Sequence, residues 1–507
     1  MGTFCLVLHT HLPYLRRNGT WPCGEDFFHQ AAAESYLPLL GTLTRLGERG
    51  LRDALTISVS PMVAHQMADP HMIRELELYL GRIELRALRQ VANYDGVFAD
   101  EVKDLAAFYC TQARTQGELL DTLPGRSIAS GLAALADAGA IEILGGPATH
   151  PYLPLIREPA LAAAQLELGR TEHVRVLGRA PAGMWLPECA YAPGLAQLLD
   201  EHNVAHVVVD GPTMLRSAGP GSTFAPRRIA DSDVVAFSRN LDVTYRVWSP
   251  TGGYPTGRWY RDFFHYDLEA GFKNWRVTSV RKPLHRKRPY EPAQGEAAAR
   301  RDAEDFAALI ATTLEQHERE TGRDGVIVAA YDTELFGHWW FEGPAFLEHL
   351  FALLEQHPSV TPSSLAAARA RMPEPEPVEL LAGSWGFRKD ERSWVADETQ
   401  WMWDALGEVE AETVRLTEKH AGTDGEALAQ LLREAFLLQS SDWPFMVLRG
   451  RNGDYAQDRF REHHERWRRL AGLLGRGSGR ALSRAAVELF DVDNVLPDLD
   501  PAELLTR

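Results

Sequence analysis

The chain has 507 residues and a formal net charge of −17, from 53 basic and 70 acidic side chains. This length exceeds the size at which one core usually stops growing, so we expect a large domain and a smaller one. The few basic runs are short, which argues against a nucleic-acid partner and favours a neutral substrate. No apolar run reaches about 18 residues, so we predict no membrane span.

The four cysteines have neither CxxC pairs nor zinc-type spacing. Disulfide-rich secreted chains use many more cysteines, so this pattern predicts reduced thiols and a cytoplasmic location. The residues concerned are Cys5, Cys23, Cys110 and Cys189.

Short apolar runs rich in β-branched residues alternate with helical segments. Their continuous hydrophobicity is typical of strands buried on both faces of a parallel sheet, either open or closed as a barrel. Catalytic side chains in such sheets gather beyond the carboxyl ends of the strands. The seven runs are 4–8, 55–59, 141–144, 183–187, 205–209, 234–237 and 326–330.

The spacing of these runs predicts the domain organisation. About 80 residues separate the second and third runs, which exceeds an ordinary connection and predicts an inserted helical subdomain at about 62–138. Residues 372–379 are rich in Pro and Glu, as at a boundary. We therefore predict a catalytic barrel over 1–370 and a C-terminal α-helical domain over 380–507.

Two acidic residues follow different predicted strands: Glu188 in "MWLPECAY" and Asp332 in "YDTELFGHWW". Cleavage of a glycosidic bond uses one carboxyl group at the anomeric carbon and another that protonates the leaving oxygen. Glu188 could instead be a strand-end side chain turned towards water, and Asp332 could cap a helix. Glu334 is a rival acid, for which we expect a structural or substrate-orienting role.

Four histidines fall on the same predicted edge of the sheet. They could donate hydrogen bonds to sugar hydroxyls or, with an aspartate, hold a metal ion that activates water. No local signature such as HExxH supports the metal site, so we predict neither a metal nor a cofactor. These residues are His9, His11, His150 and His338.

Thirteen tryptophans are a high count for this length. Aromatic planes pack well against the flat C–H faces of sugar rings, so part of this set predicts a carbohydrate groove, while core packing accounts for the rest. The segment 249–264 combines Gly, Pro and aromatic residues. It is either a loop that closes over substrate or a rigid surface loop.

Several motifs resemble those of glycoside hydrolase family 57, in particular its 1,4-α-glucan branching members. The resemblance spans most of the chain, and the motifs around Glu188 and Asp332 are the most specific. The matching segments are "HTHLPY" (9–14), "GGPATHPYLP" (145–154), "GMWLPECAY" (183–191), "YDTELFGHWWFEGP" (331–344), "SWGFRKDERSWVADETQWMWDAL" (384–406) and "QSSDWPF" (439–445).

This resemblance implies an α/β fold with an incomplete (β/α)7 TIM-like barrel, followed by helices that complete the substrate groove. It implies an α-glucan substrate and a retaining double displacement, with Glu188 as nucleophile and Asp332 as the acid that later serves as base. Burial and the Glu188 charge should then raise the pKa of Asp332.

The resemblance also implies a set of substrate-binding side chains, in which Tyr254 would shield the covalent intermediate from water. The set comprises His9, His11, Trp21, His150, Tyr254, Trp259, His338, Trp394, Trp403, Asp442 and Trp443.

Three alternatives remain open at this point. An α-amylase or 4-α-glucanotransferase of the same family would share the barrel chemistry and differ in the acceptor. A metal-dependent polysaccharide deacetylase would need an Asp/His metal site on a similar barrel. A non-catalytic glucan-binding protein would not need the carboxyl pair.

Overall fold

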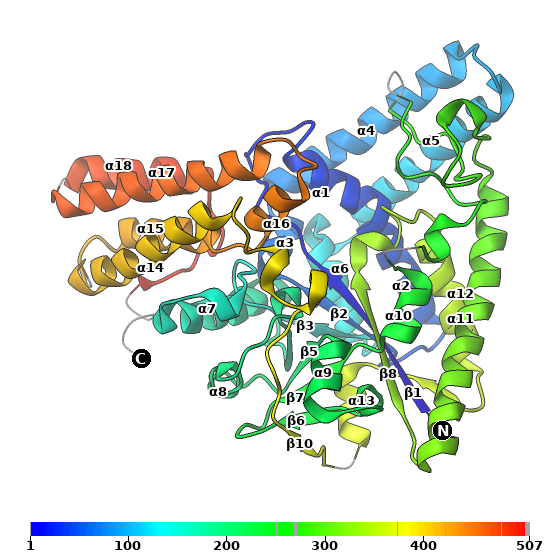
Figure 1. The fold of residues 1–507 in the computed structure, drawn as a ribbon. Helices are drawn as coiled ribbons and strands as arrows, with labels where there is room; N and C mark the ends of the chain where they lie inside the picture. The colour runs from blue at the N-terminus through cyan, green and yellow to red at the C-terminus, as the bar shows by residue number, and fades with distance from the viewer. Residues whose placement is uncertain are drawn as a thin grey trace.

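Seven parallel strands form the centre of the molecule in a computed structural model that describes residues 2–249, 252–267, 271–372, 374–420, 422–477 and 479–501 (Figure 1). All seven coincide with the apolar runs predicted from the sequence. The strands are β1 (Gly2–Thr10), β2 (Leu55–Val59), β3 (Ile141–Leu144), β4 (Gly183–Trp185), β5 (His206–Val209), β7 (Val235–Ser238) and β8 (Val326–Asp332).

The strands close into an incomplete (β/α)7 barrel. One ladder has the order β3-β2-β1-β8 and a second contains β7-β5-β4. Single parallel bridges, Gly145 with Met184 and Arg239 with Val328, join the two ladders at both edges. The predicted fold class is therefore confirmed. Three short strands add to these ladders: β6 (Arg227–Ile229) pairs with β7, β10 (Pro377–Val378) pairs with β6, and β9 (Val360–Pro362) pairs with the start of β1.

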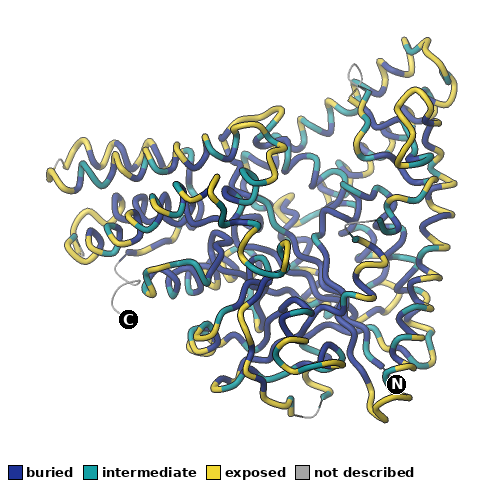
Figure 2. The backbone as a smooth tube through the Cα atoms, viewed as in Figure 1, coloured by how far each residue is buried: buried dark blue, intermediate teal, exposed yellow. Residues whose placement is uncertain are grey.

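Helices cover the outside of the barrel, so the strands are dark blue, that is buried, at the centre of Figure 2. β2 and β5 are buried along their whole length, as their continuous apolar sequences require. The covering helices are α1 (Glu25–Ala31), α2 (Leu37–Glu48), α7 (Pro159–Leu177), α8 (Leu195–Glu201), α9 (Gly211–Ala218), α10 (Leu241–Val247), α11 (Pro292–Thr321), α12 (Gly343–Glu355) and α13 (Leu365–Arg371).

Four helices separate β2 from β3. Side chains cap three of them: Ser60 accepts from the backbone N–H of Val63, Asp69 from those of His71 and Met72, and Ser127 from that of Ser130. The long pair α4 and α5 extends away from the barrel in Figure 1. The four are α3 (Pro61–Ala68), α4 (Pro70–Asn93), α5 (Ala99–Thr122) and α6 (Ile128–Asp137).

Five helices follow the barrel and lie to one side of it, coloured yellow to red in Figure 1. Their apolar stripes face one another, with Leu431, Phe460 and Leu470 buried in a separate core. The helices are α14 (Gln400–His420), α15 (Gly425–Leu438), α16 (Asp442–Arg449), α17 (Tyr455–Gly475) and α18 (Gly479–Phe490).

A buried polar cluster ties α15 and α17 to the segment after α18. The Nδ1 of His463 lies 2.8 Å from Glu434 Oε2, and Arg459 donates to its Nε2 at 2.6 Å. Arg466 forms an ion pair with Asp493. The ligand atoms of Glu434, His463 and Asp493 lie within 4.8 Å of one another, as around a cation. Burial and the nearby Asp493 raise the pKa of Glu434 well above its usual range, while Arg466 balances the charge of Asp493, so the cluster acts as an internal brace.

The cysteines of the chain are all free, as predicted. Among the described residues, no helix has both the length and the apolar character needed to cross a lipid bilayer.

Candidate active site

The turn that follows β4 holds Glu188 in a strained backbone conformation. Its φ of 64° and ψ of 15° are left-handed, and a residue with a Cβ pays about 1 to 2 kcal/mol to adopt them. The carbonyl of Glu188 accepts a hydrogen bond from the backbone N–H of Trp385 at 2.8 Å. Strain of this kind persists where surrounding contacts fix the chain, which is common at functional sites.

Two side chains from distant segments donate to the Glu188 carboxylate. Trp385 donates from Nε1 to Oε2 at 2.8 Å, and Ser441 donates from its hydroxyl to Oε1 at 2.8 Å. Neither donor was among the predicted site residues. Both lie in motifs that the sequence analysis quoted, so the available signal was their place in "SWGF" and "QSSDW" rather than their residue type.

A chain of hydrogen bonds runs from Ser441 back into the barrel. His150 lies 3.0 Å from Ser441 through Nδ1 and 3.1 Å from His9 through Nε2, while His9 Nδ1 lies 3.2 Å from Ser58 Oγ. Burial lowers the pKa of His9 and of His150 well below the usual value, so both rings are neutral. Because Ser441 donates to Glu188, it accepts from His150 Nδ1–H, and His150 Nε2 then accepts from His9.

Strand register brings Asp332 to the same place. His9 on β1 is paired with Ser58 on β2 and with Asp332 on β8. Since His9 also contacts His150, whose Nδ1 lies 4.0 Å from Glu188 Oε1, the ends of β4 and β8 meet beside the same two histidines. Among the described residues, no group donates a hydrogen bond to the Asp332 carboxylate.

Burial raises the pKa of both carboxyl groups, to about 7 for Glu188 and to about 6 for Asp332. At Glu188 the donors Trp385 and Ser441 oppose the shift, whereas the Asp332 charge adds to it. The sequence analysis expected the raised pKa at Asp332 alone. The structure raises that of Glu188 as well, because the carboxylate that receives two donors is also largely withdrawn from solvent.

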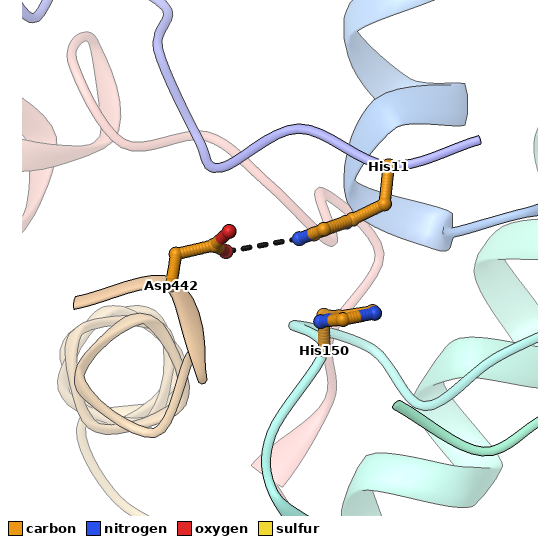
Figure 3. Close-up of side chains that lie close together, drawn as sticks. All are labelled: His11, His150 and Asp442. Atoms are coloured by element: carbon orange, nitrogen blue, oxygen red, sulfur yellow. Dashed lines mark hydrogen bonds and ion pairs between the residues drawn. The ribbon is translucent and has the colours of Figure 1, made fainter. Parts of the chain in front are cut away.

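His11 and Asp442 form an ion pair across the top of His150 (Figure 3). His11 Nε2 lies 2.9 Å from Asp442 Oδ2, and its Nδ1 lies 2.8 Å from Ser60 Oγ. Burial alone would raise the pKa of Asp442, but His11 holds it at about 2, so the carboxylate is ionised. The C-terminal helices thus place the Asp442 carboxylate, which stays ionised near neutral pH, beside His11.

The same three residues offer ligand atoms within 4.8 Å of one another, which is the spacing of a metal site. The rings of His11 and His150 are stacked, however, with centroids 3.6 Å apart and an angle of 11° between planes. The nitrogen lone pairs lie in the ring planes. Because the two planes are nearly parallel, the lone pairs of the two rings do not converge on one ion. The ring nitrogens also have hydrogen-bond partners. This arrangement favours a hydrogen-bonding role.

A buried group of ion-paired side chains lies against the Trp385 ring through Arg239. Asp210 lies 3.1 Å from Arg239 Nη1 and 2.9 Å from Lys389 Nζ. The guanidinium of Arg239 lies over the Trp385 ring at 5.2 Å from its centroid. Arg239 also lowers the pKa of Asp332 against the effect of burial. One cation therefore acts on the indole that holds Glu188 and on the second carboxyl group.

Glu334 and His338 follow β8 but have other partners. Tyr36 donates to the Glu334 carboxyl group, whose pKa is raised to about 8 by burial and by Asp332. His338 Nδ1 lies 2.6 Å from Glu34 Oε2. His338 thus joins a network with Glu34 instead of the stacked histidines, which separates it from the group predicted at this edge.

Three predicted substrate-binding aromatics are buried in cores, and their contact with a glucan stays a prediction. Tyr254 donates to Asp305 at 2.5 Å and packs between α11 and α12, because Gly253 at φ 132° brings the loop onto the Val247 carbonyl. Trp394 packs against Tyr152 and Phe445. Trp443 donates to the Leu437 carbonyl inside the helical core. None of the three has a face open to a glucan.

The remaining predicted tryptophans keep some exposure. Trp21 is 78% exposed on the loop before α1. Trp403 is partly buried and donates to the Trp394 carbonyl at 3.0 Å. The Trp259 ring is covered by Arg276, 4.1 Å from its centroid, and is also in contact with Arg258. Its predicted sugar contact is therefore occupied by protein groups.

The raised pKa of Glu188 predicts how the thermal stability of the protein depends on pH. An acid with a raised pKa destabilises the fold only where it is ionised, so its cost is absent near pH 4 and complete above pH 7. We expect Glu188→Gln to raise the thermal midpoint at pH 8, reflecting about 3 kcal/mol, and to change it little at pH 4.5. Thermal unfolding at the two pH values measures this.

The matched control for that measurement is Glu315→Gln, at an exposed position on α11. Solvent screens this position, so its midpoint should match that of the unaltered chain at both pH values. An equal shift of the Glu188→Gln variant at pH 4.5 and pH 8 would contradict the enclosure argument.

Comparisons with known proteins agree with this site. Residues 5–376 match the model of glycosyl hydrolase family 57, and residues 405–503 match that of the 1,4-alpha-glucan branching enzyme C-terminal region. A Mycobacterium tuberculosis protein described as "Probable 1,4-alpha-glucan branching enzyme" is 36% identical, covering 99% of this chain and 98% of that protein.

Two solved structures share the whole architecture. The branching enzyme of this family from Pyrococcus horikoshii has a TM-score of 0.93 at 32% identity, covering 100% of this chain and 97% of that one. An alpha-amylase from Thermotoga maritima has a TM-score of 0.89 at 25% identity, covering 100% and 99%. The strand-end carboxyl pair, the barrel that carries it and the family match over most of the sequence lead to one conclusion: this chain belongs to glycosyl hydrolase family 57.

Proposed function

We propose that this chain is a retaining 1,4-α-glucan branching enzyme, which cleaves an α-1,4 linkage and transfers the released chain to a glucan 6-hydroxyl. One observation carries the proposal: two largely enclosed carboxyl groups lie beside the same histidines but differ in their surroundings. Glu188 receives two hydrogen bonds and Asp332 receives none from the described residues. The two donors oppose the effect of burial on Glu188, and the pKa values of about 7 for Glu188 and about 6 for Asp332 are close enough for the pair to share one proton. We assign attack to Glu188, because Trp385 and Ser441 hold its carboxylate in place, and proton transfer to Asp332.

In the first step, Glu188 attacks the anomeric carbon of the donor sugar as the bond to the leaving oxygen breaks. Asp332 gives its proton to that oxygen, which leaves as the 4-hydroxyl of the shortened chain. Trp385 and Ser441 hold the attacking carboxylate in place. The product is a covalent glucosyl-enzyme. Loss of the Glu188 charge then lowers the pKa of Asp332.

In the second step, Asp332 removes the proton from an acceptor 6-hydroxyl, whose oxygen attacks the anomeric carbon and releases Glu188. Two inversions give net retention and an α-1,6 branch. His9, His11 and His150 are proposed to border the donor sugar and, through their ring nitrogens, to hold Ser441 and Asp442 in place beside it. Asp442 is proposed to fix His11 and not to react, since a carboxyl group with a pKa of about 2 does not carry a proton near neutrality.

The C-terminal helices support transfer as the reaction. They supply Ser441 and Asp442 to the cavity, and the region matches the model named for branching enzymes. An α-amylase is the second candidate, because the Thermotoga maritima relative shares the whole fold. The two activities differ only in whether a sugar hydroxyl or water accepts the glucosyl group.

Product analysis separates these candidates. We expect amylose incubated with the protein to gain α-1,6 linkages, seen by proton NMR, with little increase in reducing ends. The measurement after debranching gives the length of the transferred chains. A strong rise in reducing ends without an α-1,6 signal would identify a hydrolase instead.

Glu188→Gln tests the nucleophile. The amide keeps the shape and the Trp385 contact but cannot form the ester, so we expect branching to fall on the order of 10³-fold or more while amylose still binds. Initial rates and glucan binding are measured on the same preparation. Glu315→Gln, on the exposed face of α11, should keep full activity. Branching by Glu188→Gln within a few-fold of the unaltered rate would exclude this role.

The raised pKa values predict the pH profile. The active form holds one proton on the pair, so kcat/KM should fall below about pH 6 as both groups are protonated and above about pH 7 as both lose their protons. Initial rates from pH 4.5 to 9 at constant ionic strength measure this. A flat profile across that range would show that the pair does not control the reaction.

We also propose a cellular location and a binding partner for the protein. The free cysteines are consistent with a reducing compartment, which supports a cytoplasmic location. An α-glucan is the proposed partner.

A further inference from the structure

The position of the Asp332 carboxyl group depends on the backbone that carries it. Asp332 ends β8, and the 3-10 turn Thr333–Leu335 follows directly. Its carboxylate receives no hydrogen bond from the described residues, whereas Trp385 and Ser441 hold that of Glu188. A reacting group without donors of its own keeps one geometry only if the chain on both sides of it is fixed. The β8 ladder fixes the chain before Asp332, so the contacts of the following segment decide its position.

A π-helical turn between α1 and α2 lies against this following segment. It comprises Ala32–Tyr36, and the backbone N–H of Leu37 closes it on the Ala32 carbonyl, which is the i→i+5 bond of a π-helix. Turns of this kind are rare and occur frequently at functional sites. We call Ala32–Tyr36 the π-turn. Its last three side chains all contact the segment 333–338.

The Ser35 hydroxyl binds the backbone of this segment. It is fully buried and lies 2.9 Å from the Thr333 carbonyl oxygen and 2.8 Å from that of Phe336, so both carbonyl groups share its one proton. The next residue, Tyr36, donates to the Glu334 carboxyl group. Burial and the neighbouring Glu334 raise the pKa of Tyr36 well above its usual range, so this hydroxyl keeps its proton and remains a donor.

Close packing and a contact from β1 complete the hold on this segment. Gly337, at φ 118°, lies so near the π-turn that a Cβ there would overlap the Glu34 carbonyl oxygen. The Glu34 carboxylate meets His338 Nδ1 at 2.6 Å. On β1, the Thr10 hydroxyl lies 2.8 Å from that of Thr333. The segment after Asp332 is therefore joined both to the π-turn and to the barrel.

We propose that Ser35 and Tyr36 are positioning residues for Asp332. They fix the chain that follows it, so that its carboxyl group stays within reach of the glycosidic oxygen when it gives up its proton and of the acceptor hydroxyl when it takes one. This inference rests on the proposed role of Asp332 as acid and base. Loosening the segment would displace the carboxyl group, and a small displacement slows proton transfer far more than it weakens substrate binding.

The test compares reactants that need proton transfer with reactants that do not. Amylose branching uses Asp332 in both steps. An α-maltooligosyl fluoride loses fluoride ion without a proton, and azide then attacks the glycosyl-enzyme as an anion, so this pair bypasses the acid and the base. We expect Ser35→Ala and Tyr36→Phe each to lower kcat for amylose branching about tenfold or more, with KM within about twofold. Fluoride release in the presence of azide should change by less than about threefold.

Ser232→Ala provides the comparison, because it also removes a buried hydroxyl, which donates to the Ile229 carbonyl at 3.0 Å in the turn between β6 and β7. Both of its rates should match those of the unaltered chain. Equal losses with both sets of reactants, or no loss with either, overturn the inference. Tyr36→Phe keeps the test decisive if Ser35→Ala does not fold. If the unaltered chain neither branches amylose nor releases fluoride, the proposed function fails, and the inference fails with it.

Discussion

The structure depends on keeping one carboxylate out of water and in one orientation. Glu188 lies in an enclosed cavity, where an ionised group is costly unless donors compensate for its lost hydration. The compensation comes from Trp385 and Ser441, which lie 197 and 253 residues further along the chain. Three separate segments must therefore be in place before the carboxylate is stable in this position. The left-handed backbone at Glu188 adds to what those contacts have to hold.

This dependence makes the C-terminal helices part of the site. Ser441 and Asp442 lie at the start of α16, where they meet His150 and His11 from the barrel loops. The helices have their own apolar core and a buried ionic brace between Glu434, His463 and Asp493, so α16 is presented by a rigid support. A barrel without these helices would lack one Glu188 donor and the fixed negative charge of Asp442.

The neutral, anionic and cationic groups around the two carboxyl groups have different roles. Neutral His9 and His150 transmit hydrogen bonds to Ser441 without adding charge, whereas Asp442 stays ionised beside His11. On the other side, Arg239 offsets part of the burial of Asp332. The result is a pair of carboxyl groups that can share one proton near neutral pH.

The sequence by itself determined the strands and the two carboxyl groups. Continuous β-branched runs form strands that are buried on both faces, by the barrel interior on one and by the helices on the other. All seven could therefore be read in chain order, and the residues after them marked Glu188, Asp332, His9 and His150. Only the tertiary structure decided which aromatic residues face the cavity. Trp385 and Trp394 occur in one motif, yet the first reaches Glu188 and the second packs against Tyr152. Residue type records that an indole is needed, but its direction depends on backbone turns such as that at Gly253, and on partners such as Asp305 and Ser441 that lie far away in the sequence.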